Sequence, residues 1–444
     1  MSKDKGYIVP SIPQGMQELL PKEQILFNKM MDTIKSTYEL FGFIPVDTPV
    51  MEKAEVLLAK SGGDTEKQVY RFFKGDHELA MRFDLTVPLA RFVAQHFGEL
   101  TFPFRRYHIG KAYRGERPQK GRFREFYQCD IDIIGNGALS IINDAEIPSI
   151  IYTVFKALGF ESFTIKMNNR KSLNGLFAYL EIIDKVEVMR IIDKIDKVGI
   201  DVLKNMLNEA GVSEKAAETL LSIITFNGSS EEILQNLEKF DIENDVFQTG
   251  IREMQEVLKY INSFGVPKEN YTVDLSIARG LDYYTGTVYE TILNDYPSIG
   301  SVCSGGRYDN LAQNYTDKEL PGVGISIGLS RLFYQLTAGK IISTDGPAST
   351  AQLMIIPMED SREFALGTAT KIRQSGINTE VYFSDGKINK KMSYANKLGI
   401  PFVIVIGENE KNTGRFSLKN MLSGEQTDAD ADEVISIIKG ETNG

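Results

Sequence analysis

Hairpin-like pairs of β-segments dominate the first 340 residues, and they constrain the fold more than any other feature of the sequence. Val69–Phe73 and Leu79–Phe83 flank a turn at Lys74–His77, which is typical of a hairpin. Tyr107–Tyr113 and Glu125–Ile134 have strand-like patterns on either side of a basic loop. The regular alternation of strands and helices that builds a doubly wound sheet is missing. We therefore expect an α+β fold, with helices packed on an antiparallel sheet.

The pattern changes at two places further along the chain. From Lys171 to Asp245 apolar residues recur at helical spacing, which predicts an inserted helical module. Between residues 338 and 352 glycine, serine, threonine and proline concentrate and mark a boundary. Strand and helix patterns alternate beyond it, which is typical of a small α/β domain. The predicted organisation is a first domain at 1–340, a helical insertion at 171–245 and a tail domain at 350–444.

The composition is that of an ordinary soluble protein. Hydrophobic residues make up 42% and charged residues 25% of the 444 positions, and no apolar run is long enough to span a membrane. The two cysteines, Cys129 and Cys303, fit a reducing compartment, so we expect a cytoplasmic protein with no membrane partner. The three histidines lie far from these cysteines in the sequence, and no metal site is predicted.

Positive charge is concentrated in one segment, although the whole chain carries a net charge of −10. Arg105–Arg124 contains eight lysines and arginines and one acid, Glu116, and three aromatic residues are interleaved with them. A solvated loop is the simpler interpretation. An anion-binding site is favoured, because phosphate contacts depend on where basic residues cluster.

Arg114 and Glu116 stand where the first strand of this basic segment ends. An arginine can donate two hydrogen bonds to an α-phosphate, while the neighbouring glutamate faces an exocyclic amine. A strand-end ion pair between the two side chains is the structural alternative.

Two further pairs of polar residues share a face by strand alternation. Gln128 and Asp132 are four residues apart on the second predicted strand, so both side chains point to one side. A carboxylate beside an amide suits an α-ammonium group. Asp84 and Thr86 also share a face if their segment is extended.

Three later segments offer ligand contacts. Tyr283 and Tyr284 follow a glycine turn and line either the core or a pocket for a small planar ligand. Arg279 precedes the flexible Gly280, so its guanidinium can reach a reacting phosphate. A glycine-rich strand runs into a helix that carries Arg331, which can hold a γ-phosphate from the opposite side.

Taken in order, these segments resemble the histidyl-tRNA synthetase family of class II aminoacyl-tRNA synthetases over essentially the whole chain. Phe41–Glu52 resembles motif 1, Arg105–Gly135 motif 2 and Gly328–Arg331 motif 3 of the class. Arg279–Tyr284 and Ser304–Asp309 resemble the two stretches particular to the histidine enzymes.

The resemblance implies a role for each candidate residue. The ammonium group of histidine would be bound by Asp84, Thr86, Gln128 and Asp132. The imidazole ring would lie in a pocket lined by Tyr283 and Tyr284. ATP would be bound by Arg114, Glu116 and Arg331, with Arg114 and Arg279 as the catalytic arginines. The acceptor end of tRNA would be read by Arg117 and Gln119.

The resemblance also implies the reaction and the partners: L-histidine, ATP with Mg²⁺, and tRNA(His), handled by a homodimer formed through motif 1. It implies a class II catalytic domain followed by an anticodon-binding domain. Two positions depart from the family pattern, since Ser330 and Asp132 stand where many members have glutamate. Ser330 leaves one nucleotide or Mg²⁺ contact in doubt.

Two other functions are compatible with parts of the sequence. A regulatory paralogue of ATP phosphoribosyltransferase shares the catalytic fold and binds histidine without charging tRNA. Such a paralogue is expected to lack the tail domain and to have lost Arg114 or Arg279, yet all are present. A non-catalytic nucleic-acid-binding module would not need Asp84, Gln128 and Asp132 together.

Overall fold

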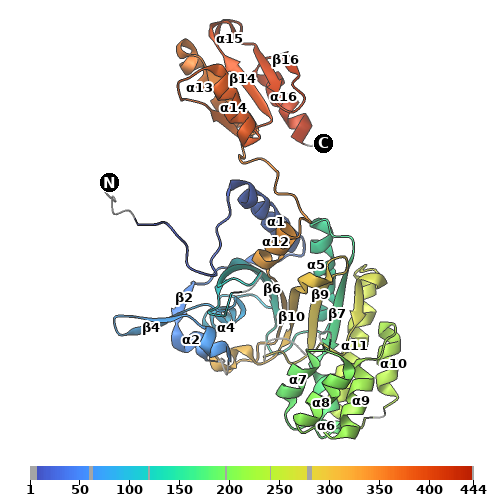
Figure 1. Cartoon of the computed structure of the whole chain (residues 1–444). Coiled ribbons are helices and arrows are strands. Elements are labelled where there is room, and N and C mark those ends of the chain that lie inside the picture. The colour runs from blue at the N-terminus through green and yellow to red at the C-terminus, as the bar shows by residue number, and fades with distance from the viewer. Residues whose placement is uncertain are drawn as a thin grey trace, which may run out of the picture. The chain divides into compact units, whose positions relative to one another are not determined.

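The computed structural model describes residues 8–59, 64–118, 121–195, 198–240, 242–277 and 283–442. The chain forms two compact units: one consists of the residues up to Gln17 together with Met30–Gly339, and the other of Glu18–Lys29 together with the residues from Lys340 onward. The first unit is built on a large sheet covered by helices, and the second has a smaller sheet of its own (Figure 1).

The large sheet has eight strands. Their spatial order is β1 (Ile44–Pro45), β5 (Phe104–Tyr113), β6 (Glu125–Ile134), β11 (Gly322–Ile327), β10 (Ser301–Tyr308), β9 (Thr287–Leu293), β7 (Phe163–Asn169) and β8 (Tyr271–Val273). Neighbouring strands are antiparallel except at the two edges, where β1 pairs with β5 and β7 with β8 in parallel. The predicted α+β class with an antiparallel sheet is confirmed.

Strand β6 lies near the middle of this sheet and is buried on both faces. Gln128, Asp130 and Asp132 alternate along one face, while Cys129 and Ile131 on the other face are fully buried. Helix α1 (Pro21–Leu40) packs on β6 through its last turns, where the Tyr38 hydroxyl donates to the Cys129 carbonyl over 3.0 Å. The polar face of β6 is therefore presented by a rigid central element.

Helices cover the other parts of the sheet. Helix α5 (Ile142–Ala157) packs on β10 and β11, and α11 (Asp245–Ser263) packs on α5 and β7. Ile147, Ile150 and Val154 of α5 are fully buried because they recur on one helical face. Helix α12 (Leu329–Ala338) follows β11 and contacts β6.

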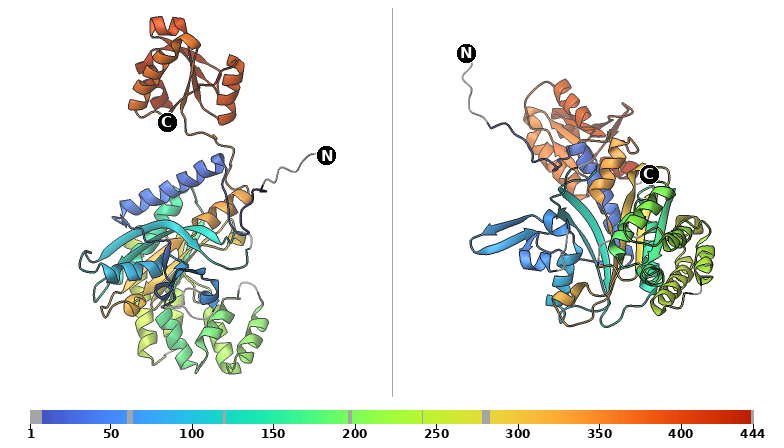
Figure 2. Two further views of the ribbon diagram at one scale, coloured as in Figure 1. Left: turned by 90° about the vertical axis from the view of Figure 1, so that its left-hand side faces the viewer. Right: turned by 60° about the horizontal axis from the view of Figure 1, so that its bottom comes forward.

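The predicted helical insertion is a group of short helices between β7 and α11, grouped to one side of the sheet (Figure 2). These helices are α6 (Arg170–Tyr179), α7 (Lys185–Ile192), α8 (Ile200–Glu209), α9 (Glu214–Ile224) and α10 (Ser230–Glu238). Their starts are set by local chemistry: Ser229 and Glu232, for example, form a reciprocal capping box at α10.

A small three-stranded sheet contains the predicted hairpin. Its order is β2 (Met51–Lys53), β4 (His77–Met81) and β3 (Arg71–Lys74), so the hairpin prediction is confirmed. Helix α2 (Ala54–Leu58) contacts β2 and β4, while α3 (Asp64–Gln68) precedes the hairpin in the chain and α4 (Thr86–Gln95) follows it. Because α4 begins at Thr86, the expectation that Asp84 and Thr86 share the face of an extended segment is wrong.

The second unit has a five-stranded mixed sheet in the order β13 (Thr379–Val381), β12 (Leu353–Pro357), β14 (Phe402–Ile406), β15 (Phe416–Asn420) and β16 (Gln426–Ala429). Its helices are α13 (Arg362–Gln374), α14 (Ile388–Leu398), α15 (Glu408–Thr413) and α16 (Ala431–Thr442). The sequence predicted the elements up to β14. The antiparallel pair β15–β16 was not predicted.

The part of the chain that the structure describes also contains four short 3₁₀ helices, at Lys268–Asn270, Pro297–Ile299, Leu311–Asn314 and Glu359–Ser361. None of the helices in the described ranges is long and apolar enough to cross a membrane.

Candidate active site

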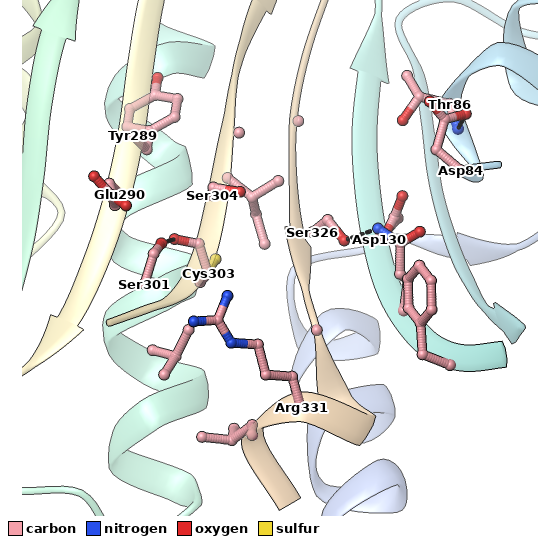
Figure 3. Close-up of a pocket in the computed structure, with 18 of the residues that line it drawn as sticks. Asp84, Thr86, Asp130, Tyr289, Glu290, Ser301, Cys303, Ser304, Ser326 and Arg331 are labelled. Atoms are coloured by element: carbon pink, nitrogen blue, oxygen red, sulfur yellow. Dashed lines mark hydrogen bonds between the residues drawn. The ribbon is translucent and has the colours of Figure 1, made fainter. Parts of the chain in front are cut away.

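A cavity of about 450 Å³ opens on the large sheet of the first unit (Figure 3). Its walls come from β6, β9, β10 and β11, from the segment before α4 and from the start of α12. Sequence-predicted residues from distant parts of the chain meet in its lining: Asp84, Thr86, Arg114, Glu116, Gln128, Asp132, Tyr283, Tyr284 and Arg331.

Arg114 is held in the cavity wall by a hydrogen bond to a backbone carbonyl and by two aromatic rings. Its Nε donates to the carbonyl of Phe83 over 3.2 Å, and its guanidinium lies 4.4 Å from the Phe83 ring centre and 5.0 Å from that of Phe126. Burial lowers the pKa of Arg114, while the charges of Asp84 and Glu116 act against this shift. A positive group fixed at a cavity wall is suited to an anionic ligand.

The recorded ion pair of Glu116 is not with Arg114. Glu116 Oε2 lies 3.6 Å from Arg122 Nη1, and both residues line the cavity. The strand-end ion pair considered as the alternative for Arg114 and Glu116 is therefore not what the structure shows.

Part of the positive charge in the basic segment is neutralised within the fold. The guanidinium of Arg105 forms two contacts of 2.9 Å with Glu146 on α5, and Lys111 lies 2.7 Å from Glu125. The net charge of +7 counted along the sequence thus overstates the field that a ligand would meet. Arg114 and Arg122 line the cavity itself.

Asp132 is already engaged on both carboxylate oxygens. Arg106 lies directly opposite it on β5, and its Nη2 is 2.6 Å from Asp132 Oδ2. The Tyr308 hydroxyl donates to Asp132 Oδ1 over 2.7 Å. Burial raises the pKa of Asp132 to about 6, against the lowering effect of Arg106 and Tyr308. Neither Arg106 nor Tyr308 was singled out in the sequence as a site residue.

Gln128 and Asp130 lie next to each other on the same face of β6. The Gln128 Nε2 donates to the Ser326 hydroxyl on β11 over 2.7 Å. Gln128 Oε1 and Asp130 Oδ1 are buried and have no hydrogen-bond partner in the described part of the chain. The pKa of Asp130 is raised to about 7, because the effect of burial outweighs the lowering effect of Arg106. The alternation that paired Gln128 with Asp132 also identifies Asp130, which the sequence analysis missed.

Asp84 closes the first turn of α4. Its Oδ1 accepts from the backbone N–H groups of Thr86 over 3.2 Å and of Val87 over 2.9 Å. Burial raises the pKa of Asp84, and these two N–H groups oppose the rise. Thr86 also hydrogen-bonds Tyr283, so the start of α4 orients one of the predicted tyrosines.

The two tyrosines do both things considered from the sequence: they pack on the core and they line the cavity. Tyr283 and Tyr284 meet edge to face with their ring centres 4.9 Å apart, and Tyr283 meets Tyr308 at 5.9 Å. Both rings pack on an apolar cluster that includes Leu89 and Phe104, and both line the cavity. Burial raises the pKa of each phenol, so both remain neutral.

Two glycines make room for these polar side chains. A Cβ atom on Gly324 would lie 2.2 Å from the Ile131 carbonyl oxygen and 2.4 Å from Asp132 Oδ1. A Cβ atom on Gly306 would lie 3.0 Å from a ring carbon of Tyr284. The floor of the cavity is therefore formed by backbone of β10 and β11.

The start of α12 supplies the cation on another wall. Arg331 Nη2 donates to the Ile299 carbonyl over 2.9 Å, and its side chain extends toward Ser301 and Cys303 (Figure 3). The neighbouring Ser330 is buried, and its hydroxyl accepts from the Tyr127 N–H over 2.8 Å. At this departure from the family pattern, the side chain joins α12 to β6.

Several lining residues were given no role in the sequence analysis. Glu290 on β9 and Ser304 on β10 are directly paired across the two strands and both line the cavity. Arg307, inside a stretch that the sequence analysis quoted, turns out to hold α5: its Nη2 lies 2.6 Å from the buried Asp144.

Three predicted residues are not among the lining residues given above. Arg117 is exposed and does not belong to the lining. Arg279 and Gln119 lie outside the described residues.

Comparisons with known proteins give consistent matches over both units. Residues 15–332 match the family described as "Histidyl-tRNA synthetase", and residues 352–441 match "Anticodon binding domain". The histidine–tRNA ligase of Clostridium tetani is 59% identical over 98% of this chain and 99% of its own length. The crystal structure of histidyl-tRNA synthetase from Nostoc sp. PCC 7120 is 37% identical, covers 98% of this chain and 100% of that chain, and has a TM-score of 0.90.

A second similar structure bears on the fold alone. It is described as an ATP phosphoribosyltransferase regulatory subunit/histidyl-tRNA synthetase from Bacillus halodurans C. It is 20% identical, with a TM-score of 0.74 over 87% of this chain and 97% of that chain.

Proposed function

The chain belongs to the histidyl-tRNA synthetase family, and we propose that its cavity is where histidine is activated with ATP before transfer to tRNA(His). The observation that carries this proposal is the convergence of Arg114, Arg331, Gln128 and Tyr284 on one cavity. The two arginines suit the phosphates of a nucleotide, and the amide and the aromatic ring suit an amino acid bound beside it.

Activation is an in-line attack of the histidine carboxylate on the α-phosphorus of ATP, with pyrophosphate as the leaving group. The carboxylate is already ionised at neutral pH, so the protein supplies no base. Its task is to orient two anions and to stabilise the charge that develops at the phosphorus. Arg114 would donate to the α-phosphate and Arg331 to the γ-phosphate from the opposite wall. Each well-aimed donor contributes roughly 3–4 kcal/mol to such stabilisation.

Arg279 is proposed as the second catalytic arginine. It precedes Tyr283 and Tyr284, which line the cavity, by only a few residues in the chain. A guanidinium there would share the α-phosphate with Arg114. The assignment rests on the family resemblance of Arg279–Tyr284.

Mg²⁺ fits this site as an ion bound together with ATP. The described residues hold no cluster of three or more histidine, cysteine or acidic side chains that could form a cage. Glu290 brings a carboxylate to the cavity lining and would hold the ion, while Glu116 would face the exocyclic amine of the base. One or two carboxylates beside substrate phosphates are typical of Mg²⁺ sites. When bound, the ion neutralises phosphate charge.

Histidine would be recognised at both of its ends. Gln128 Oε1 is a buried acceptor without a protein partner in the described ranges, which suits the α-ammonium group. Asp84, Thr86 and Asp132 would complete that side of the pocket. The imidazole ring would lie against Tyr283 and Tyr284, whose neutral phenols can donate or accept a hydrogen bond.

Transfer to tRNA would follow at the same cavity. The exposed Arg117 and the nearby Gln119 would contact the acceptor end, and the tail unit would contact the anticodon. The tail sequence, residues 351–444, has 11 basic and 13 acidic residues, so base and shape contacts would matter more there than bulk charge. We propose a cytoplasmic homodimer paired through the motif 1 region, Phe41–Glu52.

The alternative of a regulatory paralogue is not favoured. The likeness to the Bacillus halodurans structure extends to the fold only, whereas the relatives that are histidine–tRNA ligases match this chain over nearly its full length. The anticodon-binding unit and Arg114 are both retained.

The test is histidine-dependent exchange of labelled pyrophosphate into ATP, measured with each of the twenty amino acids. We expect exchange with histidine alone, followed by charging of tRNA(His) when the tRNA is added. Exchange with another amino acid would contradict the proposed substrate, and exchange without charging would indicate the regulatory type of protein.

A further inference from the structure

Three polar side chains form a line across the neighbouring strands β6 and β11. Ser326 on β11 is directly opposite Asp130 on β6, and its hydroxyl accepts from the Gln128 amide over 2.7 Å. Ser326 and Asp130 lie side by side in the cavity wall (Figure 3). The order along the line is amide, hydroxyl, carboxylate.

The line has a definite direction. A serine hydroxyl has one proton to donate and two lone pairs that accept, whereas an ionised carboxylate only accepts. Ser326 is the hydrogen-bonding neighbour of the Asp130 carboxyl. When the Asp130 carboxyl is ionised, the hydroxyl proton points to it, and the hydroxyl oxygen is left to accept from the Gln128 NH₂ group.

This direction determines which end of the amide the ligand meets. With Nε2 bound to Ser326, Gln128 Oε1 is the free end, and it is buried without a partner in the described part of the chain. A buried acceptor without a partner is unfavourable until a donor arrives. If the amide were turned over, its NH₂ group would face the ligand, and two donors cannot bond each other.

We propose that Ser326, with its proton held by Asp130, is a positioning residue that turns the oxygen of Gln128 toward the α-ammonium group of histidine. The inference rests on the proposed function and deepens it. Ser326 acts through Gln128 and does not itself touch the substrate. Through Gln128, Ser326 would help the enzyme to recognise the ammonium group of a free amino acid.

The first test is Ser326→Ala in the full-length enzyme, assayed by pyrophosphate exchange. We expect the KM for histidine to rise about tenfold, the loss of roughly one charge-assisted hydrogen bond. The KM for ATP should stay unchanged and kcat should fall less than threefold. Ser326→Thr keeps the hydroxyl and should restore most of the affinity.

A substrate analogue tests whether the effect concerns the ammonium group. 3-(Imidazol-4-yl)propionate has the ring and carboxylate of histidine but no amine. Its inhibition constant should be the same for the wild type and for Ser326→Ala, while the affinity for histidine falls. An equal loss for both molecules would overturn the proposal, because it would indicate a general distortion of the pocket.

A double-mutant cycle tests whether Ser326 acts through Gln128. Ser326→Ala should add no further rise in the histidine KM once Gln128→Ala is present. A further tenfold rise in that background would contradict the proposal. A wild-type enzyme without histidine-dependent exchange would contradict the proposed function instead, so the two failures are distinguishable.

Discussion

Arg106 influences its neighbours because its side chain is entirely shielded from solvent. It pairs with Asp132 and lowers the pKa of Asp130, and it also acts on His108 two positions along β5. The pKa of His108 is lowered to about 3, mainly by burial and also by the positive charges of Arg106 and Arg82, while Asp47 acts in the opposite direction. His108 is therefore neutral in the folded protein at neutral pH.

The neutral His108 makes part of the stability depend on pH. An exposed histidine titrates near pH 6.5. Between pH 6.5 and 3 the unfolded state therefore binds a proton that the folded state does not bind. The free energy of unfolding must then fall as the pH falls, from this group by about 1 kcal/mol between pH 6 and pH 5. His108→Gln removes this dependence.

Urea unfolding of the wild type and of His108→Gln at pH 7, 6 and 5 measures the effect. The stability advantage of the wild type should shrink by about 1 kcal/mol between pH 6 and 5. A difference between the two proteins that does not change with pH would contradict a neutral buried His108.

Most candidate residues could be proposed from the sequence, since strand alternation and chain order already group Gln128 with Asp132. Ser326 could not be found in this way, because it is 198 residues from Gln128 in the chain and only the pairing of β6 with β11 brings them together. The neutralisation of Arg105 by Glu146 depends in the same way on packing between a strand and a helix. A count of charges along the sequence does not show which of them are paired in the fold.

The elements themselves were predicted best where a local pattern decides them. The hairpin of β3 and β4 and the strands β5 and β6 follow from alternation and turn residues. The start of α4 at Thr86 was missed, because a short polar segment before a helix looks like a strand end until its cap is seen. Strands β15 and β16 carry few apolar residues and gave no signal.

The contact between β11 and β6 at Gly324 leads to a prediction at the level of the element. Gly324→Ala would push a methyl group against the Ile131 carbonyl and Asp132, each closer than 3 Å. We expect a loss of about 1–3 kcal/mol in the free energy of unfolding, typical of overpacking, together with a marked loss of histidine activation. Urea unfolding and pyrophosphate exchange measure the two effects.

Gly367→Ala is the matched control. Gly367 lies inside α13, and a Cβ atom there would meet nothing within 4 Å. Alanine favours the helix by roughly 0.5–1 kcal/mol, so this variant should be as stable as the wild type or more so. If Gly324→Ala and Gly367→Ala had the same stability and the same exchange activity, the close approach at Gly324 would not explain the need for glycine there.

At the scale of the whole molecule, the second unit has a hydrophobic core of its own. Fifteen buried residues between Leu353 and Ile438 form one cluster, drawn from the sheet and from α13 and α16. Among the described residues, none of the first unit belongs to this cluster. The tail unit is therefore expected to contribute to tRNA binding without shaping the cavity.

Deleting residues 350–444 should separate the two half-reactions. Pyrophosphate exchange should stay within about threefold of the wild type, whereas charging of tRNA(His) should fall roughly 10–100-fold, because a second tethered contact strengthens binding by such factors. Equal charging by the truncated and full-length proteins would refute the proposed role of the tail. The charge-reversal pair Lys387→Glu with Lys390→Glu is the point-mutant control, since both lysines are exposed.

The closed core of the tail also bears on how such a protein can change over generations. A segment whose buried apolar residues pack on one another can be exchanged as a block, since this core is built from its own residues. A chimera that joins this cavity to the tail of a distant relative would keep its amino acid and inherit a different reading of the anticodon loop. The specificity for the amino acid and the specificity for the tRNA would then change independently in evolution.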